Sequence, residues 1–82
     1  MIPVEVIAHF DIDGKITPYR VRYPKDDDMK IVYICRLLNR SINTLAGNPV
    51  EVFDCVAKDK SCEVFFALNH EKTVNKWFLT KI

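Results

Sequence analysis

The dipeptide Asp13-Gly14, set between two segments of alternating apolar and polar residues, constrains this fold more than any other feature of the sequence. In residues 4–10, apolar side chains recur at every second position, as they do in a strand with one buried face. Asp-Gly is favoured in two-residue hairpin turns, because both positions tolerate a positive φ. We therefore expect a β-hairpin that turns at Asp13-Gly14 and returns through residues 15–23.

A two-residue turn also fixes the register of this hairpin. It predicts an apolar face made of Val4 with Tyr23, Val6 with Val21, and Ala8 with Tyr19. On the opposite face Glu5 meets Arg22, a cross-strand pair of opposite charge. A slip of one residue would turn every side chain to the wrong face, so turn and pattern agree. Pro18 lacks an N–H and is expected at an edge or at a site without a ladder hydrogen bond.

Residues 30–38 fit two interpretations. They are rich in β-branched and aromatic side chains, as a buried strand is. However, apolar residues also recur at helical spacing along one face: Ile31, Ile34, Cys35, Leu38, Ile42 and Leu45. Asp28 could cap such a helix and Gly47 could end it. We favour the strand and keep a helix at about residues 29–46, within an α+β fold, as the alternative.

The rest of the chain is predicted to be β structure. Strands are expected at residues 49–58, 62–68 and 74–82, with a turn at 59–61 and a loop at 69–72. In the last strand Trp77 and Phe78 point to opposite faces, so one of them belongs to the core. Short connections between strands of this length favour an antiparallel meander of five or six strands, curled into a small barrel or half-barrel. A chain of 82 residues without an internal linker is expected to form one domain over residues 1–82.

Charge and cysteine content narrow the class of protein. A net charge of +1 argues against general attraction to polyanions. No basic segment followed by a long apolar run begins the chain, and no apolar stretch approaches the roughly 18–20 residues of a membrane span. The three cysteines are an odd number and form no C-x-x-C motif. We therefore expect a cytoplasmic protein without membrane contact, whose cysteines are mostly buried small hydrophobes.

The reactive side chains form no recognisable catalytic set. The candidate metal ligands lack the spacing of paired zinc ligands; they are His9, Cys35, Cys55, Cys62 and His70. A nucleophilic cysteine needs a nearby base, which His9 could supply, but burial of Cys35 and Cys55 in apolar strands would oppose ionisation. The acidic residues fit a turn and a solvated loop; they are Asp11, Asp13, Asp26, Asp27 and Asp28. We predict no enzyme activity, no cofactor and no metal site.

Two surfaces are candidates for binding. Lys15, Arg20, Arg22 and Lys25 lie on or beside the returning strand of the hairpin and could contact nucleic acid, as basic strands of small barrels do. Ile7 and His9 lie on the polar face of the first strand, where an isoleucine is out of place unless a second layer or a partner covers it. We expect a non-enzymatic module that acts by protein–protein contact, including contact with a second copy, and keep weak nucleic-acid binding as the alternative.

Several of these segments occur together in a recognisable order. They are residues 10–18, 31–38, 45–47, 52–55 and 76–79. In this order the chain resembles a group of short uncharacterised bacterial proteins, chiefly from Gram-positive bacteria. The resemblance implies an all-β domain and a strand at residues 31–38, and it implies no activity. The group often carries basic residues around the Leu45-Ala46-Gly47 turn, where this chain has Arg36 and Arg40 alone.

Overall fold

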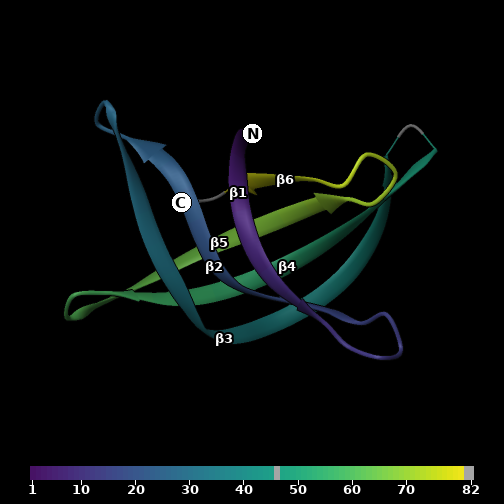
Figure 1. The fold of residues 1–82 in the computed structure, drawn as a ribbon, viewed down its shortest axis with the longest axis horizontal. Helices are drawn as coiled ribbons and strands as arrows, with labels where there is room; N and C mark the ends of the chain where they lie inside the picture. The colour runs from purple at the N-terminus through teal and green to yellow at the C-terminus, as the bar shows by residue number, and fades with distance from the viewer. Residues whose placement is uncertain (46, 81–82) are drawn as a thin grey trace.

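A computed structural model of the chain describes residues 1–45 and 47–80. Six antiparallel strands follow one another in chain order and close into a barrel (Figure 1). The strands are β1 (Ile2–Phe10), β2 (Ile16–Lys25), β3 (Asp28–Leu45), β4 (Asn48–Asp59), β5 (Cys62–Glu71) and β6 (Lys76–Thr80). The all-β meander is therefore confirmed. Among the described residues there is no helix that could cross a membrane.

The helix alternative at residues 29–46 is wrong, because the described part of this segment forms the long strand β3. The first part of β3 pairs with β2, and from Tyr33 onward it pairs with β4. The β3–β4 register shifts twice, between Ile34 and Arg36 and between Leu37 and Asn39. Each bulge adds a residue to one strand and bends it. The two extra residues break the alternation of a regular strand, and this is why the apolar residues imitate a helical face.

The predicted register of the amino-terminal hairpin is confirmed from Glu5 to Ile7 and differs beyond it. Glu5 pairs with Arg22 and Val6 with Val21, as the alternation predicts. After Ile7 the register shifts, so that Ala8 pairs with Pro18. The predicted pairing of Ala8 with Tyr19 is wrong, and the Tyr19 side chain is exposed.

The turn of this hairpin is wider than the two residues expected of Asp13-Gly14. Pairing ends at Phe10 and Ile16, and the Asp11 side chain organises the residues between. Asp11 Oδ1 accepts hydrogen bonds from the backbone N–H groups of Asp13, at 2.9 Å, and Lys15, at 2.8 Å. These local bonds give the backbone a partner that a two-residue turn would not supply, so the wider turn forms.

The carboxyl-terminal strands need two corrections, the first being that the final strand begins at Lys76 and not at Val74. Residues 69–71 continue β5 and do not form a loop. His70 pairs with Trp77 across the sheet, and its side chain is buried in the barrel. The chain turns after Glu71 and returns as β6. Predictions for Ala46, Lys81 and Ile82 concern residues outside those described.

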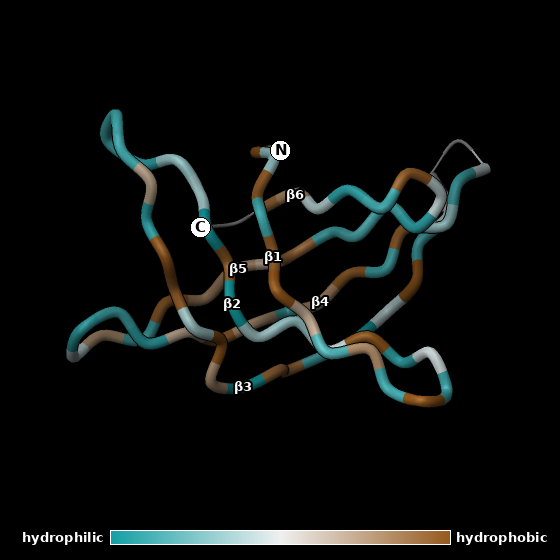
Figure 2. The backbone as a smooth tube through the Cα atoms, in the orientation of Figure 1, coloured by the Kyte–Doolittle hydropathy of each residue, from teal (hydrophilic) through white to brown (hydrophobic). Residues whose placement is uncertain are grey.

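The core is the interior of the barrel, where apolar side chains from all six strands meet. Figure 2 shows apolar and polar residues alternating along the strands, as expected for a sheet with one buried face. Phe53 is fully buried, and its ring stacks on that of Trp77 at 5.7 Å between centroids. Trp77 thus belongs to the core, whereas Phe78 is half-buried on the other face of β6. The prediction that one of this pair is a core residue is confirmed.

Candidate functional site

β1 pairs with different neighbouring strands over different stretches of its two edges. It pairs with β6 through Ile2, Pro3 and Val4. From Glu5 to Phe10 its described partner is β2, on the other edge. Within the described residues, this stretch of β1 therefore has one edge without a neighbouring strand. Such an edge presents backbone N–H and C=O groups that can pair with a further strand.

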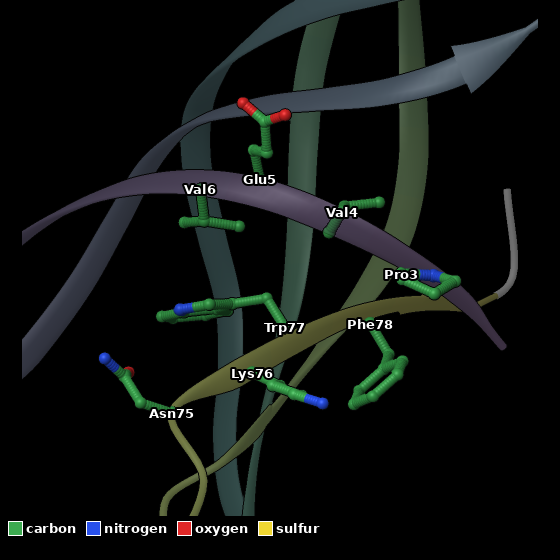
Figure 3. Close-up of a pocket in the computed structure, with 8 residues that line it drawn as sticks. All are labelled: Pro3, Val4, Glu5, Val6, Asn75, Lys76, Trp77 and Phe78. Carbon is green, nitrogen blue, oxygen red and sulfur yellow. The ribbon is translucent and has the colours of Figure 1, made fainter.

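A groove of about 520 Å³ lies where β1 and β6 diverge (Figure 3). Its lining residues are Pro3, Val4, Glu5, Val6, Asn75, Lys76, Trp77 and Phe78. Figure 3 shows the Val6 side chain pointing down toward the Trp77 ring, while Glu5 points away from it. The groove therefore has an apolar wall beside the open edge and charged groups at its rim.

The Trp77 wall is supported by a series of stacked groups. The His70 ring stacks on Trp77 at 4.2 Å between centroids and 19° between planes. Arg40 lies over the Phe53 ring at 5.2 Å, and Phe53 stacks on the same tryptophan. His70 is 3% exposed, and its Nε2 donates to Asn75 Oδ1 at 2.7 Å. Side chains from four strands and the β5–β6 turn thus fix the position of this wall.

The outer face of β1 carries the two residues predicted as an interface. Ile7 is 40% exposed, and His9 is also exposed. The barrel covers the inner side chains Val6 and Ala8, but it leaves Ile7 uncovered. On the same outer face Arg22 Nη1 lies 3.3 Å from Glu5 Oε1. An apolar side chain therefore lies beside the open edge, next to paired charges.

The structure brings two of the four predicted basic residues together. Arg20 and Arg22 lie on the outer face of β2, opposite Ile7 and Glu5 of β1. Lys15 lies at the β1–β2 turn and Lys25 at the other end of β2, so neither joins this pair. Arg22 is already bound to Glu5, whereas Arg20 Nε has no hydrogen-bond partner among the described residues.

The cysteines differ from the prediction that they are mostly buried. Cys55 is buried, whereas Cys35 and Cys62 are exposed. The β4–β5 register places Cys55 opposite Phe66 and Cys62 opposite Asp59, at separate points along the ladder. Burial raises the pKa of the Cys55 thiol to about 12, which keeps this sulfur protonated at neutral pH. Among the described residues no group of three ligating side chains could hold a metal ion.

Sequence reasoning identified Ile7 and His9, but it missed the groove and its Asn75 and Trp77 wall. The signal available was indirect: a polar stretch at residues 69–72 that is followed by an aromatic pair. The site combines an open strand edge, which can form backbone hydrogen bonds, with an apolar wall beside it. No protein-family model, no curated protein and no solved structure matches this chain.

Proposed function

We propose that this protein is a non-enzymatic interaction module, which binds an extended polypeptide segment along residues 5–10 of β1. The observation that carries the proposal is the open edge of β1, which lies beside the groove in front of Trp77. Strand addition to such an edge takes its affinity from main-chain hydrogen bonds and its specificity from pockets for alternate side chains.

The surroundings of the edge favour a bound strand of alternating character. Side chains on the inner face of an added strand would enter the groove beside Val6 and Trp77, so apolar residues fit there. Side chains on the outer face would lie beside Glu5, Ile7 and His9. A segment that alternates apolar with polar or charged residues matches both sides.

The test is selection of displayed random decapeptides on the immobilised protein, followed by NMR titration of the enriched peptides. We expect the bound sequences to alternate, and the amide resonances of residues 5–10 and of Asn75–Trp77 to shift. Ile7→Lys places a charge beside the edge and should weaken binding by about tenfold. Ile31→Lys is the matched control, because Ile31 is 43% exposed and lies on β3, which pairs with β2 at this point and does not contact β1. No enrichment, or shifts confined to another face, would refute the proposal.

A second candidate function is binding of single-stranded nucleic acid on the outer face of β2 and β3. The observation that favours it is the exposure of Tyr19 and Tyr33 on either side of Arg20, which is paired with Tyr33. Exposed rings with a neighbouring cation are the elements of a stacking surface. We expect a mixed-sequence oligonucleotide to bind weakly and with strong salt dependence. Unchanged retention on an oligonucleotide column after Arg20→Glu combined with Arg22→Glu would exclude it.

A further inference from the structure

We propose that the strand received by β1 is β1 of a second copy, so that two barrels join edge to edge across a two-fold axis at Ile7. This inference rests on the proposed function, because it uses the same open edge. Two identical strands in antiparallel orientation offer each other the same hydrogen-bonding groups, and the contact closes on itself as a dimer. The sequence of β1 is therefore complementary to itself.

The side chains of β1 favour one register. With Ile7 opposite Ile7 of the second copy, Glu5 faces His9 and Val6 faces Ala8 across the new pair. The two exposed isoleucines then cover each other on the outer face. The carboxylate of Glu5 accepts a hydrogen bond from the imidazole of the facing His9, and this pairing occurs twice because of the symmetry.

Two neighbouring registers also keep inner and outer side chains on their own faces, but they pair the charged residues less favourably. An axis at Ala8 would place Glu5 opposite Asp11, and like charges directly opposite each other destabilise a sheet. An axis at Val6 would place Glu5 opposite Ile7 and leave His9 without an acidic partner. Charge complementarity therefore selects the axis at Ile7.

The same register accounts for Phe10, which is 58% exposed in the single barrel. The register directs Phe10 of the second copy toward Val4, whose edge is already paired with Trp77, so strand pairing stops before Val4 and Phe10 meets the end of β6. Phe10 shares the inner face of β1 with Val4 and Val6, so its ring is carried to the mouth of the groove beside Trp77. Pairing with a second copy thus brings an exposed aromatic ring of each chain to an apolar wall of the other.

The first test introduces a charge at His9 of β1. His9→Glu places two carboxylates opposite each other at both ends of the interface, whereas His9→Lys places an ammonium group opposite each Glu5 carboxylate. We expect sedimentation equilibrium to show a dimer for the wild type and for His9→Lys. The dissociation constant of His9→Glu and of Ile7→Lys should be raised at least tenfold. Ile31→Lys, a substitution of similar exposure outside the edge, should leave the dimer intact.

The second test uses the symmetry axis. A residue on the axis meets its own copy with Cα atoms about 4.5–5.5 Å apart, which is within the range that a disulfide spans. The exposed Cys35 and Cys62 are first changed to serine, and Ile7→Cys is then introduced. Mild oxidation should link this variant into a covalent dimer. Ile31→Cys in the same background should form the dimer without a covalent link.

The outcomes separate this inference from the proposed function. A wild-type protein that is monomeric at all concentrations, yet binds the selected peptides along β1, overturns the dimer and leaves the interaction module standing. A dimer that is indifferent to His9→Glu and Ile7→Lys, and is not linked through residue 7, also overturns the inference, because another face would then hold the copies together. A dimer that the peptides dissociate supports both.

Discussion

Among single residues, Lys30 and Asp59 form the ion pair with the most direct consequence for stability. Lys30 lies on β3 and Asp59 at the end of β4, and each side chain is about one-third exposed. The hydrogen bond from Lys30 lowers the pKa of the Asp59 carboxyl group below its usual value. The same bond raises the pKa of the Lys30 ammonium group. The ion pair therefore links the bent strand β3 to the end of its neighbour β4.

The first prediction is that Asp59→Asn lowers the stability at neutral pH and makes it less dependent on acid. Because the folded pKa of Asp59 lies below the unfolded value, its contribution is complete above the unfolded pKa of 3.8 and is lost as the pH falls through the folded value. The Lys30 contribution is complete below the unfolded pKa of 10.5 and is lost as the pH rises through its raised value.

Urea unfolding followed by Trp77 fluorescence, at neutral pH and in the acid range, measures this effect. The wild type should lose a part of its free energy of unfolding on acidification that Asp59→Asn does not lose. Glu63→Gln is the control, since Glu63 forms a longer and exposed contact with Arg36 at 3.9 Å. Parallel pH profiles for the wild type and Asp59→Asn would contradict the prediction.

At the scale of the strands and their turns, a two-residue hairpin turn lies at a place where none was predicted. Asp26 and Asp27 connect β2 to β3, with φ angles of 52° and 63°. Lys25 and Asp28 pair on either side of them. Two consecutive positive φ angles are typical of the type I′ turn, whose twist matches that of the adjacent strands. The sequence Asp-Asp is a poorer fit for this turn than Asn-Gly, so the turn stores backbone strain.

We predict that Asp27→Gly relieves this strain and raises the free energy of unfolding by up to about 1 kcal/mol, because glycine adopts a positive φ at no steric cost. Asp28→Asn removes the same charge at a residue within the strand, and it should have a smaller effect. Urea denaturation midpoints compare the two variants. An equal gain in both would show that relief of charge repulsion, and not the backbone, is responsible.

Other elements show which local signals predict structure and which do not. Residues 4–10 alternate regularly and pair as expected up to Ile7, because period-two alternation and one buried face describe the same physical arrangement. The bulges of β3 defeat this signal, since an added residue changes which face the next side chain occupies. The strand at His70 was missed for a different reason. A polar residue at this position is typical of a loop, and its place in a strand depends on stacking against Trp77 inside the barrel.

For the whole molecule, the sequence predicts the strands and their order better than it predicts the closure of the barrel. Neighbouring strands are specified by local turns, whereas the contact between β1 and β6 joins the two ends of the chain. The point at which those strands diverge depends on the twist of all six, and no short segment encodes it. The exposed apolar side chain of Ile7 was predictable because it interrupts a polar face, while the groove beside Asn75 required the closed sheet.

In the described part of the chain, three residue pairs join β1 to β6, and they also determine how the barrel opens. Loss of these few pairs converts a closed ring into an open ribbon and leaves the other ladders intact, so this is the lowest-cost local unfolding event available to the sheet. In the open sheet β1 and β6 are both edge strands without a partner. When two such ribbons meet in concentrated solution, the first strand of each can occupy the vacant place in the other, and the chains leave the encounter as a domain-swapped pair.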